Sequence, residues 1–398
     1  MSYKLLSKVY YQNIEDYKKL YEERINSDST KVLGIKIHDN KAFYCLTNDI
    51  YNLSMKIMEL DKKVQVLKGN LPGVAIEQFT NKSLIDEIML TNDIEGVYST
   101  RKEIKIILSE SESPKGNKRK FSGLVTRYKM LGRNKISLSN CDDIRRIYDE
   151  LVLPEIMSDD PLQVPDGKIF RKSLAEVTTA TQKVIHKGVY PESKIVECME
   201  DSLTILNDDS IQILVRIAIF HYLFGYIHPF YDGNGRTSRF ISSYLLSNCL
   251  DNLISYRLSY TIKENISDYY EAFKTCNDDK NKGDLTPFVI SFLKILSKAF
   301  EKLYEALYDR KTQLDEAYKK LDNIDFLRET DLYEISSILI QAALFSVDGI
   351  SVKELCESLK FSDSTIRKKL NKILEYGYLS TIKVGKYKYY KFNIEKMK

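Results

Sequence analysis

Twelve consecutive residues, HPFYDGNGRTSR at 228–239, bring together the side chains that phosphoryl or nucleotidyl transfer needs. His228 is the candidate base, because it is the group of this segment that titrates near neutral pH. Asp232 supplies a carboxylate that can hold Mg²⁺ through oxygen, as a nucleoside triphosphate requires. Arg236 and Arg239 are three residues apart on a first helical turn, so both can face one phosphate group. This set of groups predicts transfer of a phosphoryl or nucleotidyl group.

The flanking sequence predicts that this segment is a loop between two helices. An apolar helix is expected to end near Tyr226, and Pro229 prevents its continuation. Gly233 and Gly235 allow the loop to bend sharply before a second helix begins. Backbone N–H groups at a helix start that is reached through a glycine-rich turn form an anion site. The pattern therefore predicts a polyphosphate cradle next to His228.

The same segment resembles the signature of the Fic family, HPFx(D/E)GNGRxxR, at every position. The resemblance extends from about Asn81 to Leu296, and it takes in GKIFRKS at 167–173 and GDLTPF at 283–288. It implies a mostly helical core. It also implies the activity of the family, whose members transfer AMP from ATP to a hydroxyl of a target protein. ATP is then the expected substrate and Mg²⁺ the expected metal.

The resemblance also implies a role for each residue of the motif. His228 would deprotonate a Ser, Thr or Tyr hydroxyl of the target, whose oxygen would attack the α-phosphorus in line. Asp232 would hold Mg²⁺ between phosphates. The phosphates would lie in a cradle that ends in two guanidinium groups on the β and γ positions: Gly233, Asn234, Gly235, Arg236 and Arg239.

Two further features complete the expected core. Phe230 would anchor the loop in the hydrophobic interior. A hairpin expected at 177–190 resembles the family's flap, which clamps a target segment by strand-like pairing. Self-modification is expected in a dilute assay.

A second resemblance concerns regulation. TNDIEG at 91–96 matches the family's inhibitory pattern, (S/T)xxxE(G/N), on a helix expected near 82–96 that ends at Gly96. This position is similar to the family class whose inhibitory helix lies N-terminal in the same chain. Glu95 would pair with Arg239 and occupy the place of the γ-phosphate, with Thr91 opening the pattern. ATP would then bind with a misaligned α-phosphorus, and in-line transfer tolerates little displacement.

Length and composition predict a mainly α-helical, multidomain protein. The chain has 398 residues, of which 43% are hydrophobic and 29% charged, so it can bury a large core and is not globally disordered. We expect a small N-terminal α+β subdomain at 1–75, a Fic core at 76–325 and a C-terminal winged helix-turn-helix domain at 326–398. Six widely spaced cysteines do not favour a zinc site or a disulfide framework. Without a secretion signal or membrane segment, the chain is expected to be cytoplasmic.

The tail has the layout of a winged helix and a basic charge. Ser351 and Glu354 form a capping-box pattern, Gly377 closes a second helix, and 379–392 is expected to be a hairpin. Residues 351–398 carry 12 Lys and Arg against 5 Asp and Glu, whereas the whole chain has a net charge of +4. DNA binding therefore stays open for this unit. The cations that would contact DNA phosphates lie on the second helix and the hairpin: Arg367, Lys368, Lys369, Lys372, Lys383, Lys386, Lys388 and Lys391.

Several alternatives stay open at this point. Some Fic relatives use the inhibitory glutamate to remove AMP, and others transfer phosphate or another nucleotide. A rival from another class is a DNA-binding regulator whose Fic core only senses a nucleotide. The target protein and homo-oligomer formation are not specified by the sequence. Among the remaining histidines, His221 and His38 are expected to be structural, and His186 is expected to be exposed in the flap.

Overall fold

The computed structural model describes residues 3–110, 119–133, 135–178, 184–328, 330–385 and 387–397. In these residues α-helices dominate and the strands form three small sheets, which confirms the expected mainly α-helical class. None of the helices in these ranges combines the length and the apolar character needed to cross a bilayer.

The helices follow one another along nearly the whole chain. Their bounds are α1 (Leu6–Gln12), α2 (Ile14–Ile25), α3 (Asn48–Gly69), α4 (Gly73–Ile94), α5 (Arg101–Glu110), α6 (Ser122–Lys129), α7 (Cys141–Leu151), α8 (Leu153–Asp159), α9 (Glu192–Leu206), α10 (Ile213–Ile227), α11 (Asn234–Cys249), α12 (Leu258–Glu264), α13 (Ile266–Asn277), α14 (Thr286–Leu321), α15 (Thr330–Phe345), α16 (Val352–Leu359) and α17 (Asp363–Glu375).

The strands form two hairpins and one three-stranded sheet, all antiparallel. The three-stranded sheet has the order β5-β7-β6. The bounds are β1 (Thr30–Ile37) with β2 (Asn40–Cys45), β3 (Glu176–Thr178) with β4 (Val184–Lys187), and β5 (Ile350–Ser351), β6 (Leu379–Val384) and β7 (Tyr387–Phe392).

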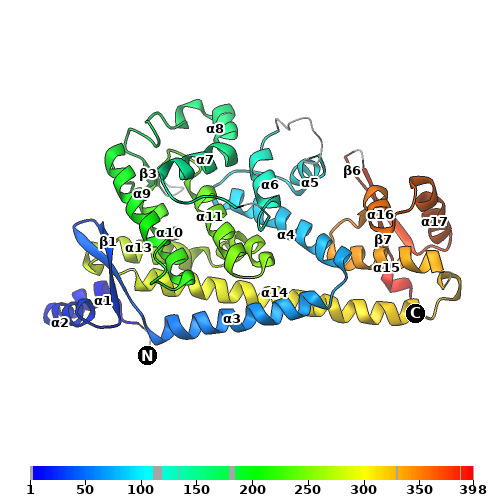
Figure 1. The fold of residues 1–398 in the computed structure, drawn as a ribbon, viewed down its shortest axis with the longest axis horizontal. Helices are drawn as coiled ribbons and strands as arrows, with labels where there is room; N and C mark the ends of the chain where they lie inside the picture. The colour runs from blue at the N-terminus through cyan, green and yellow to red at the C-terminus, as the bar shows by residue number, and fades with distance from the viewer. Residues whose placement is uncertain are drawn as a thin grey trace.

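Two long helices, α3 and α14, run side by side along one edge of the molecule (Figure 1). α14 is one continuous helix of 36 residues with Pro287 in its first turn, where the missing N–H costs nothing. On α3, Ile50, Ile57 and Val64 are fully buried at seven-residue intervals, the spacing of a seam between helices packed along their length. The other helices of the core lie on this platform.

The apolar helix α10 is buried on nearly all sides, as expected for a helix with no polar face. It packs against α9, α11 and α14. A short loop joins its end at Ile227 to the start of α11 at Asn234. The expected helix–loop–helix around the HPFYDGNGRTSR segment is thus confirmed.

α4 begins at Gly73, well before the expected start near residue 82. Pro72 has an extended backbone at the N-cap, and the buried Ala75 and Phe79 extend the apolar face of the helix toward it. The GNLPG turn therefore leads straight into the helix. At the other end, Glu95 is the C-cap and Gly96 takes the left-handed conformation, with φ of 73°, as the sequence predicts.

The C-terminal elements α15, α16, α17 and the β5-β7-β6 sheet lie at one end of the platform, beside α4 and α5 (Figure 1). The capping box of Ser351 and Glu354 is present at the start of α16. Gly377 follows α17 with a positive φ of 77°, and β6 and β7 form the expected hairpin. α15 packs along α4, so this unit contacts the helix that ends at Glu95.

Candidate active site

The loop after α10 is anchored by an aromatic stack. Phe230 is fully buried, and its ring lies parallel to Tyr148 with 3.7 Å between the ring centroids and edge-on to Phe170 at 5.5 Å. Such contacts add to the burial of apolar area. Phe230 therefore anchors the loop in the hydrophobic interior, as the sequence predicts.

Asn234 fixes the shape of the loop. Its side-chain oxygen accepts a hydrogen bond from Phe230 N at 2.9 Å, and its amide donates to Phe230 O at 2.8 Å. The sequence assigned Asn234 to the phosphate cradle, but in this structure both polar groups of its side chain bind the backbone of Phe230. The donors that remain for an anion are the backbone N–H groups at the start of α11.

The first turn of α11 has the form expected of an anion site. Gly233 is its N-cap, with φ of 80°, and a Cβ there would lie 2.9 Å from Val152. Gly235 is the second residue of α11, where a Cβ would overlap the carboxylate of Glu95. Both glycines are therefore needed, one for its backbone conformation and one for the close approach of an acidic group.

Glu95 and Arg239 form an ion pair at this point. Arg239 Nη2 donates to Glu95 Oε1 at 2.8 Å, and the guanidinium also donates to the hydroxyl and the carbonyl oxygen of Thr91 at 2.8 and 2.9 Å. Arg239 is buried, and the Glu95 carboxylate raises the pKa of its guanidinium against the opposing effect of burial. The structure thus brings Thr91, Glu95, Gly235 and Arg239 together.

Arg236 has a different acidic partner. Its Nη1 donates to Glu155 Oε1 at 2.6 Å, and its Nη2 lies 3.6 Å from Asp232 Oδ2. The two arginines expected to face one phosphate are therefore paired separately, Arg239 with Glu95 and Arg236 with Glu155. Burial raises the pKa of Glu155, and Arg236 opposes that rise. In the described part of the chain the buried Nε of Arg236 has no hydrogen-bond partner.

His228 caps α10 in the left-handed conformation, with φ of 52°, and the residue as a whole is half-buried. Desolvation by the surrounding protein, with smaller contributions from His186 and Arg171, lowers the pKa of the imidazole to about 3. A hydrogen bond to the Gly225 carbonyl acts in the opposite direction. The ring is therefore neutral near pH 7, the state in which it can accept a proton.

Arg171 ties the His228 loop to the flap, a role that the sequence did not reveal. It is fully buried, and its guanidinium donates to four backbone carbonyls, those of His228 at 2.9 Å, Ser173 at 2.6 Å, Val189 at 2.8 Å and Ile227 at 3.4 Å. Its backbone N–H also donates to Pro229 O at 3.2 Å. The segment GKIFRKS pointed to this region, but nothing in it shows which carbonyls Arg171 would bind.

The flap expected at 177–190 is in part described. β3 and β4 pair at the expected place, and their turn, residues 179–183, lies outside the described residues. The expectation that His186 is exposed is wrong, because the ring is only partly exposed and its Nε2 donates to Tyr226 O at 2.6 Å. Burial lowers the pKa of His186, so the ring is neutral. His221 is structural as expected, since it is buried and its ring nitrogens lie 2.8 Å from Ser242 Oγ and Tyr269 Oη.

Asp232 fits the part expected of a metal ligand. Its side chain is 45% exposed at the mouth of the cradle, with Oδ1 near the Gly233 N–H and Oδ2 facing Arg236. The described residues hold no cluster of three or more acidic, His or Cys side chains that could bind a metal by themselves. One carboxylate completed by substrate phosphates and water is how proteins commonly hold Mg²⁺. The donor set therefore fits a metal that arrives with a nucleotide.

Comparisons with known proteins agree with this geometry. Residues 139–246, which include the HPFYDGNGRTSR segment, match the model of the Fic/DOC family. The chain is 37% identical over 95 residues to Protein adenylyltransferase Fic of Drosophila willistoni, covering 24% of this chain and 17% of that protein. It is 31% identical over 157 residues to Protein adenylyltransferase fic-1 of Caenorhabditis elegans, covering 38% and 28%. The chain thus spans less than a third of the length of these two relatives.

A solved structure extends the likeness beyond the matched segment. The fold is similar to that in the crystal structure of a Fic family protein from Desulfovibrio desulfuricans, with a TM-score of 0.54 and 21% sequence identity, over 88% of this chain and 97% of that one. At this level of identity the likeness shows a shared fold. The segment 139–246 is therefore a Fic/DOC family domain, and it holds the complete motif and the anchored loop.

Proposed function

We propose that this protein transfers AMP from ATP to a Ser, Thr or Tyr hydroxyl of a target protein and of itself, and that Glu95 inhibits this reaction. The observation that carries the proposal is the position of the Glu95 carboxylate, against Gly235 and 2.8 Å from Arg239, at the start of α11. A helix start with an arginine favours a negative group. The relatives named adenylyltransferases support AMP as the group that is moved.

The groups of the site divide the work of an in-line displacement. His228, neutral near pH 7, takes the proton of the acceptor hydroxyl, whose oxygen attacks the α-phosphorus while the bond to pyrophosphate breaks. The N–H groups at the start of α11, together with Arg236 and Arg239, hold the polyphosphate. A Mg²⁺ ion held by Asp232 would neutralise charge on the phosphates. The flap strands β3 and β4 offer an edge to the target segment.

Inhibition follows from competition between like charges. As long as Glu95 pairs with Arg239, a γ-phosphate directed at that guanidinium meets a carboxylate in its place. The nucleotide then binds with its α-phosphorus out of line, and a shift of about 1 Å can cost on the order of a hundredfold in rate. α4 thus acts as an inhibitory helix within the chain.

The decisive experiment is labelling with ATP that carries the label on the α-phosphate. The wild type and Glu95→Gly are compared with and without Mg²⁺, and mass spectrometry identifies the added group on the protein. We expect an added AMP that is far more abundant on Glu95→Gly. Label on neither protein, or a mass other than that of AMP, would contradict the proposal, and a phosphate or another nucleotide would identify a related transfer reaction.

Removal of AMP is an alternative for the same site, because Glu95 can also orient a water molecule. The assay separates the two reactions when purified, AMP-modified Glu95→Gly protein is incubated with unlabelled wild type. Loss of label that depends on Glu95 of the added wild type would favour removal.

A second candidate function, DNA binding, rests on the C-terminal unit, which we propose to be a winged helix-turn-helix domain at 326–398, beside an N-terminal subdomain at 1–75 and a Fic core at 76–325. α17 lies at the outer end of the molecule (Figure 1). Lys383 and Lys388, both exposed, stand directly opposite each other on β6 and β7. Like charges in this position repel, and a phosphate would relieve the repulsion. Lys386 lies outside the described residues.

A gel-shift with the full chain at several salt concentrations tests DNA binding. If the two lysines contact phosphates, the variant Lys383→Ala/Lys388→Ala should lower the slope of log affinity against log salt by about 2. Equal slopes, or no shift at low salt, would remove DNA as a partner.

The six cysteines are free thiols, which supports our further proposal of a cytoplasmic protein.

A further inference from the structure

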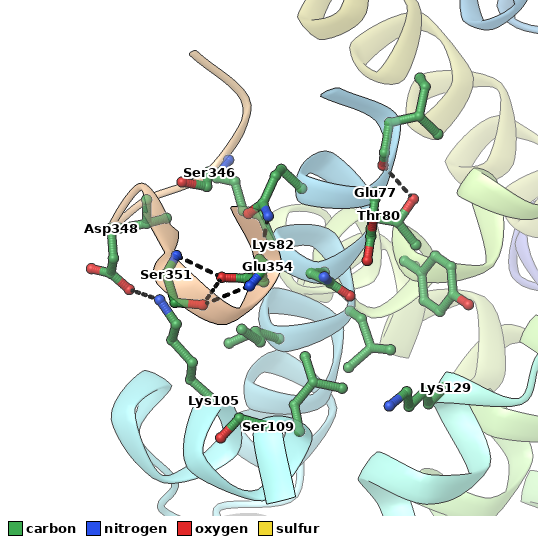
Figure 2. Close-up of a pocket in the computed structure, with 18 of the residues that line it drawn as sticks. Glu77, Thr80, Lys82, Lys105, Ser109, Lys129, Ser346, Asp348, Ser351 and Glu354 are labelled. Atoms are coloured by element: carbon green, nitrogen blue, oxygen red, sulfur yellow. Dashed lines mark hydrogen bonds and ion pairs between the residues drawn. The ribbon is translucent and has the colours of Figure 1, made fainter. Parts of the chain in front are cut away.

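A cavity of about 500 Å³ lies between α4, α5 and the C-terminal unit, away from the HPFYDGNGRTSR loop. One side is formed by α4 and α5, a second by the segment from Ser346 to Glu357 together with Tyr387 and Tyr389 of β7, and a third by residues between Lys129 and Arg133 at the end of α6. In Figure 2, Lys105 and Lys129 stand on opposite sides of the cavity, and Glu354 and Lys82 lie between them. The volume is that of a site for a small molecule.

The cavity is lined by more cations than carboxylates. The cations are Lys82, Arg101, Lys105, Lys129, Arg133 and Lys353, and the carboxylates are Glu77, Asp348, Glu354 and Glu357. Three of the carboxylates have defined partners. Asp348 accepts from Lys105 at 2.7 Å, Glu357 lies 3.6 Å from Lys353, and Glu354 caps α16 and accepts from Gln78 at 3.2 Å. The lining therefore keeps an excess of positive charge.

The excess is concentrated at Lys82. Its Nζ lies 4.0 Å from Asp86 Oδ2, while the other oxygen of Asp86 accepts a hydrogen bond from Arg101. One carboxylate thus serves two cations. Burial lowers the pKa of Lys82, Asp86 opposes that shift, and Arg310, Arg257 and Arg101 add to it, so three further cations act on the lysine beside its one carboxylate.

The cations behind this wall are also poorly neutralised. The guanidinium of Arg310 donates to the carbonyl oxygens of Leu344 and Ala306 and lies over the ring of Phe79, and the Nε of the buried Arg257 has no hydrogen-bond partner in the described residues. Burying like charges together is costly unless an anion accompanies them.

We propose that this cavity binds a small phosphate-bearing ligand, with its phosphate at Lys82 and Arg101. Phosphate is the group that lysine and arginine bind together most effectively. The proposal does not depend on AMP transfer. A ligand bound here would contact the helix that carries Glu95, because Lys82 and Glu95 both belong to α4, about 20 Å apart along its axis. Ligand binding would in this way be linked to the position of Glu95.

Titration calorimetry with pyrophosphate, without divalent cations and at low salt, tests the site on the full chain. Lys82→Ala should weaken binding at least tenfold, and Lys82→Arg should restore it to within a few fold. Asp86→Asn, which removes the carboxylate shared by Lys82 and Arg101, should tighten binding several fold. Two control variants should leave the Lys82-dependent binding of pyrophosphate intact. Arg239→Ala removes a cation of the separate anion site at the start of α11, and Lys62→Ala removes an exposed lysine of α3 outside the cavity.

The proposal is overturned if pyrophosphate does not bind, if Lys82→Ala binds like the wild type, or if binding disappears only in Arg239→Ala. Circular dichroism of each variant confirms that it is folded. Such a failure would leave labelling by Glu95→Gly unaffected, so it is distinguishable from a failure of the proposed function.

Discussion

The carboxylate of Glu95 lies against the backbone of Gly235, so closely that a methyl group on Gly235 would overlap it. The same carboxylate accepts a hydrogen bond from Arg239 at 2.8 Å. The end of α4 thus delivers a negative charge to the start of α11, whose N–H groups and arginine favour anions. In this conformation the anion at the start of α11 is the carboxylate of Glu95, which belongs to the protein itself.

Replacing Glu95 should therefore activate the protein, and two variants separate charge from bulk. Glu95→Gly removes both and should raise the initial rate of labelling on the order of tenfold or more, about 1.4 kcal/mol of barrier. Glu95→Gln keeps the size and loses the charge, so it should give a smaller rise. Adding Arg239→Ala to Glu95→Gly should abolish the gain. Equal rates for the wild type and Glu95→Gly would remove the inhibitory role.

The pH dependence of labelling should reflect the low pKa of His228. Because the imidazole is already neutral above about pH 3, the rate of Glu95→Gly should show no fall between about pH 8 and pH 5 that is due to this base. His228→Ala should abolish labelling and leave ATP binding largely intact. A limb centred near pH 6.5, or persistent transfer by His228→Ala, would show that the base has been assigned incorrectly.

Asp232→Ala should lose Mg²⁺-dependent transfer, and Asp232→Asn should keep a part of it at high Mg²⁺ concentration, because the amide still offers one oxygen. The measurement is the Mg²⁺ titration of labelling in the Glu95→Gly background. Asp142→Ala, on the exposed side of α7, serves as the matched control. An unchanged titration for Asp232→Ala would mean that the metal is held elsewhere.

The sequence predicted the motif loop well because its signals are local. Proline and glycine fix where α10 ends and where α11 begins, and the spacing of Thr91, Glu95 and Gly96 placed the end of α4 correctly. The contacts that hold the site join residues far apart in the chain. Glu155 lies 81 residues from Arg236, and Arg171 binds carbonyls of the loop 57 residues away, so no spacing pattern could reveal them.

Arg171 should act as a positioning residue. Lysine cannot reproduce the planar fork that reaches the carbonyls of His228, Ser173 and Val189, so Arg171→Lys should destabilise the fold by about 3 kcal/mol. In the Glu95→Gly background we expect kcat to fall at least tenfold with a smaller change in KM for ATP. Arg145→Lys, which affects a single backbone carbonyl, that of Ile169, is the control. A loss of stability with kcat unchanged would mean that Arg171 serves the fold alone.

Glu87 makes the stability of the α4 junction depend on pH. It lies two turns before Glu95 on α4, is fully buried, and both of its oxygens accept from Ser259 N at 2.9 Å, at the start of α12. Burial raises the pKa of its carboxyl to about 7, and the hydrogen bonds to Ser259 oppose that rise. The folded state therefore binds the proton more tightly than the unfolded chain does. The resulting stabilisation is present below the unfolded pKa of 4.5 and is lost as the pH rises through 7.

The variant Glu87→Gln removes this titration. Between about pH 4.5 and pH 8 the wild type should lose about 3 kcal/mol of unfolding free energy relative to Glu87→Gln, as followed by urea unfolding across that range. The comparison cancels all groups that titrate alike in both proteins. Glu305→Gln, at an exposed position on α14, should run parallel to the wild type. If Glu87→Gln also runs parallel, the carboxyl of Glu87 titrates at the same pH in the folded and the unfolded chain, and the junction between α4 and α12 carries no proton-linked stability.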